Sequence, residues 1–253
     1  MTRRKIFAGN WKMYKTFGEA GELVKGIAAG LKNIGNKEVA VFPPAVYIRD
    51  IVRLCRDRHI DVGIQNVYFE KEGAFTGEIS PVMAKDTGVR YVLIGHSERR
   101  HVFGEKDGDV NKKVKAVLSA GLEPMVCVGE LLEEREAGSS DDVVKRQIKS
   151  AFSGVDAPDM KKIVIAYEPV WAIGTGKVAT PEIAETMHKL IRDTLKAVYN
   201  SSIADSMPVL YGGSVKPDNI AGLIAMENID GVLVGGASLK IDSFLDIINV
   251  KNK

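Results

Sequence analysis

Residues 164–167, Val-Ile-Ala-Tyr, decide the fold class, because all four are apolar and no polar residue alternates with them. A strand with one face in water alternates apolar and polar residues, whereas a parallel strand covered on both faces is a continuous apolar run. The stretch therefore predicts a buried parallel strand within Lys162–Glu168. Seven further short runs, most of them rich in β-branched residues, predict strands at Lys5–Gly9, Glu38–Phe42, Asp61–Gln65, Arg90–Gly95, Glu123–Val128, Pro208–Tyr211 and Gly231–Val234.

Segments with helical spacing separate these runs. Leu23, Ile27 and Leu31 recur every fourth residue. Residues 180–182, Thr-Pro-Glu, supply an N-cap, a proline at the first helical position and an acidic first turn. Gly121 suits the left-handed end of another helix. Eight strand–helix units in about 250 residues favour a closed barrel over an open sheet. Since no Ser/Gly/Pro linker divides the chain, we expect residues 1–253 to form one α/β domain, a closed eight-stranded parallel (β/α)8 barrel.

The composition excludes several classes of protein. Lys and Arg number 35 and Asp and Glu 33, so the net charge of +2 offers no basic field for nucleic acid or anionic lipid. Two cysteines exclude a disulfide framework and a four-cysteine zinc site, and the four histidines show no metal-ligand spacing. No apolar run reaches the roughly 18 residues of a membrane helix, and residues 1–10 lack the apolar core of a secretion signal. We expect a soluble, cytoplasmic, metal-free protein.

Unusual residues follow five of the predicted strands, each time at the carboxyl end. They are residues 10–12 (Asn-Trp-Lys), 96–98 (His-Ser-Glu), 168–169 (Glu-Pro), 212–214 (Gly-Gly-Ser) and 235–236 (Gly-Gly). The opposite loops, such as 33–37 and 155–161, have the composition of ordinary connectors. Barrel enzymes carry their chemistry at the carboxyl ends of the strands, so this asymmetry predicts a functional site there.

Three side chains at these ends suit acid–base chemistry. Pro169 keeps Glu168 extended at the end of an apolar strand, where a carboxylate can remove a proton from a carbon beside a carbonyl. His96 lies at the predicted start of a helix, whose dipole is expected to lower its pKa and favour a neutral ring that donates to a carbonyl. Lys12 can stabilise developing negative charge. Each side chain also has an interpretation without a function: Glu168 as a solvated carboxylate, His96 as a structural histidine and Lys12 as a solvated lysine.

Two glycine pairs and one loop suit a phosphate ligand. Gly212–Ser214 and Gly235–Gly236 each end a predicted strand and open a predicted helical segment, so their backbone N–H groups can converge on one anion. Glycines also simply fit tight turns. No nucleotide-binding glycine motif occurs. Residues 169–179 contain Trp171 and Ile173 on a loop, which predicts a lid with hinges at Pro169 and 177–179.

Two further positions complete the candidate residues. The long loop at 66–80 carries a phenylalanine between glycines, which suits insertion into a pocket of another subunit. Cys127 lies in an apolar strand, where a buried, inert thiol is the favoured interpretation.

Five segments together resemble the triosephosphate isomerase family, and the resemblance runs in order from about residue 5 to about residue 245. The segments are residues 9–13 (GNWKM), 95–100 (GHSERR), 166–176 (AYEPVWAIGTG), 211–215 (YGGSV) and 233–239 (LVGGASL). The resemblance implies a TIM barrel that interconverts dihydroxyacetone phosphate and D-glyceraldehyde 3-phosphate through an enediolate, in glycolysis and gluconeogenesis, without a cofactor.

The resemblance also implies a role for each site residue. Glu168 is the base, His96 polarises the carbonyl and moves protons between the two oxygens, and Lys12 stabilises negative charge. Asn10 positions the oxygen end, and Glu98 is similar to the carboxylate beside the catalytic lysine.

Backbone contacts of Gly174, Ser214, Gly235 and Gly236 hold the phosphate in the family that this chain resembles. There the loop at 66–80 docks into a second subunit, with Thr76 against Asn10 of the partner subunit, so a homodimer or larger homo-oligomer is expected.

Two alternatives stay open at this point. A phosphosugar aldolase would use Lys12 as a Schiff-base amine. A phosphate-ligand binding protein would have kept the site but lost turnover, although the presence of Glu168, His96 and Lys12 together argues against this.

Overall fold

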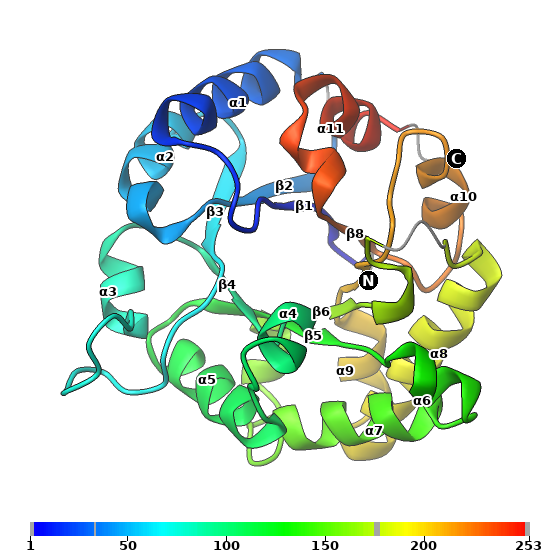
Figure 1. Ribbon diagram of the computed structural model, residues 1–253. Coiled ribbons are helices and arrows are strands. Elements are labelled where there is room, and N and C mark those ends of the chain that lie inside the picture. Colours follow the sequence, from blue (N-terminus) through cyan, green and yellow to red (C-terminus); the bar gives the residue numbers. More distant parts are fainter. Residues whose placement is uncertain (1–2, 33, 175–177, 251–253) are drawn as a thin grey trace.

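Eight parallel strands close into a barrel in the order of the sequence, and helices form a ring around it (Figure 1). The computed structural model describes residues 3–32, 34–174 and 178–250. The strands are β1 (Lys5–Asn10), β2 (Lys37–Phe42), β3 (Ile60–Ile64), β4 (Tyr91–Ile94), β5 (Glu123–Val128), β6 (Val164–Tyr167), β7 (Val209–Tyr211) and β8 (Gly231–Val234). Each lies where the sequence predicted a strand, with ends that differ by two residues at most. The predicted TIM barrel is confirmed.

The helices fill the segments between the strands. They are α1 (Phe17–Gly30), α2 (Ile48–Cys55), α3 (Pro81–Asp86), α4 (Ser97–His101), α5 (Asp107–Ser119), α6 (Leu132–Glu136), α7 (Ser140–Ala151), α8 (Pro181–Val198), α9 (Ser201–Ser206), α10 (Ile220–Ile224) and α11 (Ile241–Ile248). Short 3-10 turns lie at Ala45–Tyr47, Asp159–Lys162, Val170–Ala172 and Gly236–Leu239. The predicted cap of α8 is confirmed, because the Thr180 side chain accepts the N–H of Ile183. Gly121 has the predicted left-handed conformation after α5, with φ +72°.

One helix start was predicted wrongly. The sequence placed a helical segment directly after Gly212–Ser214, but α10 begins only at Ile220. The Asn219 side chain accepts the N–H of Lys216 at 2.9 Å and donates to the carbonyl of Ser214 at 3.0 Å, which stabilises a turn in between. The other glycine pair behaves as predicted, since a 3-10 turn starts at Gly236.

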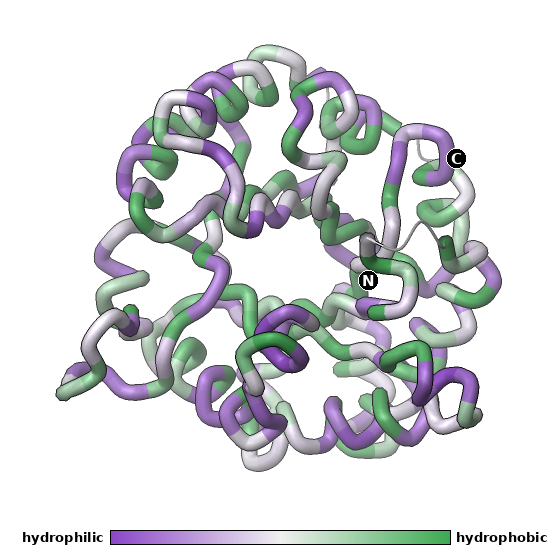
Figure 2. The backbone as a smooth tube through the Cα atoms, viewed as in Figure 1, coloured by the Kyte–Doolittle hydropathy of each residue, from purple (hydrophilic) through white to green (hydrophobic). Residues whose placement is uncertain are grey.

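Both faces of the strands are buried, which explains their continuous apolar composition. In β1, Ile6 and Ala8 belong to one apolar cluster that lies inside the barrel, whereas Phe7 belongs to the larger cluster between the strands and the helices. The inner cluster is tightly filled: a Cβ on Gly63 would overlap the ring of Phe42. Figure 2 shows hydrophobic and hydrophilic residues alternating along the outer helices, which turn one side to the strands.

Charged side chains close the amino end of the barrel. Arg90 contacts Asp61 and Glu123, each at 2.8 Å, and the Tyr91 hydroxyl donates to Glu38 at 2.8 Å. Ion pairs and hydrogen bonds engage the polar groups at this end, so the opposite end is the place to look for unused polar groups.

Candidate active site

A cavity of about 420 Å³ opens at the carboxyl ends of the strands. Eight of the residues to which the resemblance assigns a role in the site line it: Asn10, Lys12, His96, Glu168, Gly174, Ser214, Gly235 and Gly236. Glu98 lines an adjoining cavity of about 240 Å³ that also contacts Asn10, Lys12 and His96. Thr76 lies apart from both, on the exposed loop at 66–80. The structure therefore brings together residues that are up to 226 positions apart in the sequence.

Glu168 lies directly after β6. The residue is only 2% exposed, yet it lines the cavity. Oε1 is 3.0 Å from Nε2 of His96, and Oε2 accepts the backbone N–H of Ser97 at 2.8 Å. Burial raises the pKa of the Glu168 carboxyl, but His96, the Ser97 N–H and the Lys12 cation outweigh burial and lower the pKa below its ordinary 4.5. The carboxylate is thus charged and restrained.

The backbone around Glu168 leaves no room for other residues. A Cβ on Gly129 would overlap the carbonyl oxygen of Glu168, and a Cβ on Gly212 would lie 3.0 Å from its Cγ. The N–H of Glu168 donates to the carbonyl of Val128 at 2.8 Å, which continues the pairing of β5 and β6 beyond the end of β6. The position of the carboxylate is therefore fixed by three neighbouring strands.

His96 caps the amino end of α4, as the sequence predicted for the start of a helix. Its Nδ1 accepts the N–H of Glu98 at 3.3 Å, so in the neutral ring the proton is on Nε2, which faces Glu168. Burial lowers the pKa of His96, but the Glu168 carboxylate outweighs burial and raises the pKa above 6.5. The predicted lowering of this pKa is wrong for this structure, because the contact with Glu168 could not be seen from the helix start alone.

Lys12, Glu98 and Asn10 form one hydrogen-bonded group beside the cavity. The Lys12 Nζ is 2.6 Å from Oε1 of Glu98, and the Lys12 N–H donates to Oδ1 of Asn10 at 3.0 Å. Asn10 is buried, and Lys12 is partly exposed toward the cavity. Lys216, which carries no motif in the sequence, also lines the cavity. Two cations on its wall favour an anionic ligand.

The glycine pair after β8 lies next to the lysine. A Cβ on Gly235 would be 3.6 Å from Cε of Lys12, and a Cβ on Gly236 would have no described heavy atom within 4 Å. Open space beside a cation, lined by backbone, is the arrangement that a phosphate needs.

The segment at 169–179 is tied to a buried carboxylate. Glu130 accepts the Trp171 Nε1–H at 2.8 Å and the Tyr167 hydroxyl at 3.1 Å. Arg135 lies over the Trp171 ring at 4.7 Å. Gly174 has φ +70° and lines the cavity. Residue 177 of the predicted hinge and residues 175–176 of the motif lie outside the described residues.

Cys127 is fully buried in β5, as predicted. Burial, and then the neighbouring Glu168 carboxylate, raise the pKa of its thiol well above 9.0. Both effects keep the thiol protonated and unreactive.

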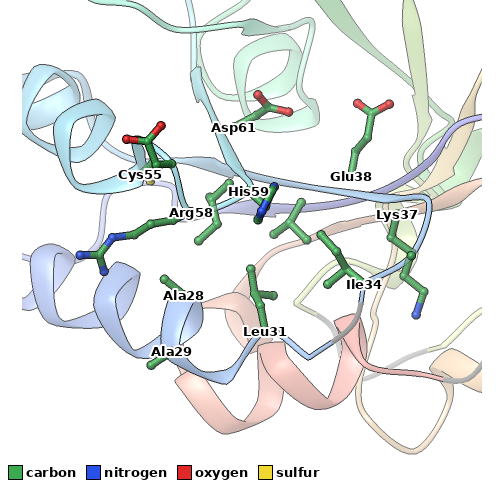
Figure 3. Close-up of a pocket in the computed structure, with 14 residues that line it drawn as sticks. Ala28, Ala29, Leu31, Ile34, Lys37, Glu38, Cys55, Arg58, His59 and Asp61 are labelled. Atoms are coloured by element: carbon green, nitrogen blue, oxygen red, sulfur yellow. The ribbon is translucent and has the colours of Figure 1, made fainter.

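A larger cavity, of about 1040 Å³, lies at the amino end of the barrel, among the ends of α1 and α2 and the starts of β2 and β3 (Figure 3). Of the three carboxylates that line it, Glu38 and Asp61 are already paired with Arg90. The eight residues assigned to the site line the smaller cavity and not this one.

Sequence reasoning missed three supporting residues of the site. Glu130 holds Trp171, Gly129 makes room for Glu168, and Gln65 donates to the carbonyl of Lys12. Each acts through a contact between distant segments, so no local pattern could have identified it.

The described residues contain no cluster of three or more His, Cys, Asp or Glu side chains that could hold a metal ion. Within the same residues, none of the helices combines the length and the apolar character that crossing a membrane requires.

Comparisons with known proteins agree with one family. The family model described as "Triosephosphate isomerase" matches residues 5–251. The chain is 52% identical to the triosephosphate isomerase of Roseiflexus sp. (strain RS-1), over 98% of this chain and 97% of the relative. It is 52% identical to that of Chloroflexus aurantiacus, over 98% and 99%, and 46% identical to that of Lactococcus lactis subsp. lactis, over 99% of both chains.

Proposed function

The chain belongs to the triosephosphate isomerase family, and we propose that Glu168, His96 and Lys12 carry its reaction. It interconverts dihydroxyacetone phosphate and D-glyceraldehyde 3-phosphate, a step of glycolysis and gluconeogenesis. The observation that carries the assignment of residues is the contact of Glu168 with His96, in a cavity that Lys12 also lines.

Glu168 is the base. As a carboxylate it takes the proton from carbon 1 of dihydroxyacetone phosphate and becomes a carboxylic acid, while the electron pair moves onto the carbonyl oxygen to give an enediolate. It later returns a proton to carbon 2. Substrate binding must break the contacts with Ser97 and His96, which lower the pKa of Glu168. Once those contacts are lost, burial remains and makes the carboxylate a stronger base.

His96 is the electrophile and proton carrier. The Glu98 N–H occupies Nδ1, so Nε2–H is available to the substrate oxygens when Glu168 moves away. The movement also removes the charge that raises the pKa of His96, and burial then favours the neutral ring. A neutral ring can donate Nε2–H to one oxygen and receive a proton from the other.

Lys12 and the glycine loops hold the charged parts of the substrate. Lys12 supplies a fixed cation near both the phosphate and the enediolate, and Asn10 positions the oxygen end. Backbone groups of Gly174, Ser214 and the Gly235–Gly236 pair hold the phosphate, which is supported by their place on the cavity wall.

A lid at 169–179 closes over the substrate in this proposal. Support comes from the different surroundings of two residues of the segment: Gly174 lines the cavity, whereas the Trp171 side chain is anchored by Glu130. Closure excludes water and protects the enediolate, which otherwise loses its phosphate.

The active protein is a homodimer or a larger homo-oligomer in the cytoplasm. Support for the assembly comes from exposed apolar side chains at positions 13, 14, 17, 75, 82, 83, 102 and 103. In Figure 1 the loop at 66–80 projects away from the ring of helices, before α3. In the assembly Thr76 contacts Asn10 of the partner subunit.

A coupled assay of triose phosphate interconversion tests the assignment. We expect Glu168→Asp to lower kcat by orders of magnitude with a smaller change in KM, because the shortened carboxylate no longer reaches carbon 1. Deuterium from solvent should enter dihydroxyacetone phosphate with the wild type and much more slowly with the variant. Equal losses in kcat and in substrate affinity would contradict the role of Glu168.

The aldolase alternative makes an opposite prediction. Borohydride in the presence of substrate would label Lys12 if it formed a Schiff base. In the structure the Lys12 Nζ is engaged by Glu98, which fits a fixed cation. We expect no label.

A wild type that binds substrate without turnover or hydrogen exchange would instead support the binding-protein alternative.

A further inference from the structure

Lys12 has a backbone conformation that lysine rarely adopts. Its φ is +51°, in the left-handed region that costs a residue with a Cβ strain energy. Such strain persists only where the surroundings fix the conformation, and it is concentrated at functional sites. The question is therefore what holds Lys12 in place.

Two side chains hold the backbone of Lys12 from opposite sides. On its amino side, Oδ1 of Asn10 accepts the Lys12 N–H at 3.0 Å. On its carboxyl side, Nε2 of Gln65 donates to the Lys12 carbonyl at 2.7 Å. Asn10 is the last residue of β1, whereas Gln65 directly follows β3, so the second contact comes from a distant segment.

Gln65 is itself anchored. Its Nε2 also donates to the carbonyl of Phe42, the last residue of β2, at 2.8 Å, and the same carbonyl accepts the Trp11 N–H at 3.1 Å. A primary amide has two N–H donors and a carbonyl has two lone pairs, so all these bonds can form together. One half-buried amide thus ties the ends of β1, β2 and β3 to the residue that carries the cation.

We propose that Gln65 is a positioning residue that acts through Lys12, by holding its left-handed backbone so that Nζ stays at the cavity beside Glu98. The proposal rests on the function proposed above for Lys12. A change of φ at residue 12 would swing the whole side chain about its Cα. Nζ would then lie away from the charged phosphate and from the enediolate, on which negative charge develops. Electrostatic stabilisation depends on such preorganisation.

Gln65→Met tests the proposal, because methionine has a similar size and shape but no N–H donor. We expect kcat/KM to fall by about 10- to 100-fold, with a rise in KM and a fall in kcat, since the cation serves both binding and turnover. The wild type is assayed first. An inactive wild type would refute the proposed function, whereas an active wild type matched by Gln65→Met would refute only the role of Gln65.

A double-mutant cycle separates positioning from general structural damage. In a Lys12→Met background, Gln65→Met should change kcat/KM by less than about twofold, because the group it positions is gone. Gln147→Met is the matched control: its buried amide binds both backbone groups of Gly129, at 2.7 and 3.0 Å, and does not touch Lys12. Its effect should be equal in both backgrounds. An equal loss from Gln65→Met in both backgrounds would overturn the proposal.

Two measurements distinguish positioning of Lys12 from a role of Gln65 in subunit association or in folding. The loss should be the same at every protein concentration, because a loss that disappears on concentration would show that Gln65 acts on subunit association and would overturn the proposal. If circular dichroism shows that Gln65→Met does not fold, Gln65→Glu decides. Its carboxyl can donate a hydrogen bond only when protonated, so its kcat/KM relative to wild type should rise from pH 8 to pH 6. A flat ratio would refute the role.

Discussion

At the scale of single residues, the contact of Glu168 with His96 makes the stability of the fold depend on pH. The folded pKa of Glu168 lies below 4.5, so its contribution is present above pH 4.5 and is lost as the pH falls through the folded value. The folded pKa of His96 lies above 6.5, so its contribution is present below pH 6.5 and is lost as the pH rises through the folded value. The pair is therefore most stabilising between about pH 4.5 and pH 6.5.

Glu168→Gln removes the charge and keeps the size of the side chain. We expect the difference in the free energy of unfolding between wild type and variant to be largest at pH 4.5–6.5 and to shrink on both sides, measured by urea unfolding across the pH range. Because the protein is expected to be an oligomer, each pair is compared at one concentration. A difference that does not change with pH would show that the pair is not ionic.

Gly236 offers a separate test of the phosphate site. A Cβ there would meet no described heavy atom within 4 Å, so a larger side chain can enter the cavity without straining the fold. Gly236→Leu should lower kcat/KM by at least about 100-fold and leave the melting temperature within a few degrees. Gly18→Leu is the control, since Gly18 has equally open surroundings on α1. Equal activity of both variants would place the phosphate elsewhere.

The sequence predicted the residues that gather at the cavity better than it predicted their electrostatics. Asn10 ends a strand and Lys12, His96 and Glu168 follow strands. Parallel strands bring such positions to one rim. The pKa of His96 was predicted from the helix start alone, and the prediction failed because the dominant neighbour lies 72 residues away. Gln65 carries no motif, since its two acceptors are the backbone carbonyls of Lys12 and Phe42, which lie in distant segments.

At the scale of elements, the N-cap of α8 is a contact that local sequence specifies completely. The Thr180 hydroxyl accepts the N–H of Ile183 at 3.3 Å, and Pro181 follows at the first helical position. Thr180→Ala should lower the free energy of unfolding by about 1 kcal/mol, the usual cost of losing such a cap. Thr180→Ser, which keeps the hydroxyl, is the control. The same urea midpoint for both variants would show that the bond does not contribute.

The strands were predicted well because they depend on local sequence, whereas the start of one helix was predicted poorly because it depends on side-chain hydrogen bonds. Strand runs are recorded in the local sequence because both faces are buried, as in 164–167. The start of α10 depends instead on the hydrogen bonds of Asn219 with Lys216 and Ser214, which make a turn of a segment whose glycines suggested a helix start. Side-chain bonds to the backbone compete with helix formation, and composition alone does not show which will win.

At the scale of the whole molecule, closure of the barrel follows from the number of units and not from any single contact. The pairing of β1 with β8 joins Ile6 to Gly231, and a Cβ on Gly231 would overlap the carbonyl of Ile6. No sequence pattern predicts this close contact of β1 and β8. Eight strand–helix units nevertheless favour a closed sheet, because closure buries both faces of every strand.

The exposed apolar side chains are the feature of the molecule that a single chain does not explain. Met13 is 93% exposed, Val102 72% and Phe103 68%, far more than the core residues. Phe75, 40% exposed, packs against Tyr68 in the loop at 66–80, with ring centroids 4.6 Å apart and the ring planes tilted by 45°. Met13 and Phe103 line the same cavity, and contiguous exposed apolar side chains mark protein interfaces. A loop whose shape is held by its own aromatic contacts can dock without a large ordering cost.

Phe75→Asp should therefore break the assembly. We expect light scattering to give at least twice the 27.5 kDa of the chain for the wild type and a single chain for the variant, because the carboxylate would be buried without a partner. Val198→Asp is the matched control, since Val198 is 42% exposed on α8 and belongs to the outer ring. The activity of Phe75→Asp should fall together with its mass, whereas Val198→Asp should keep both. The reason is that Asn10, which holds Lys12, is expected to contact Thr76 of the partner subunit. A fully active single chain would show that the site is complete without a partner and that the loop at 66–80 does not support catalysis.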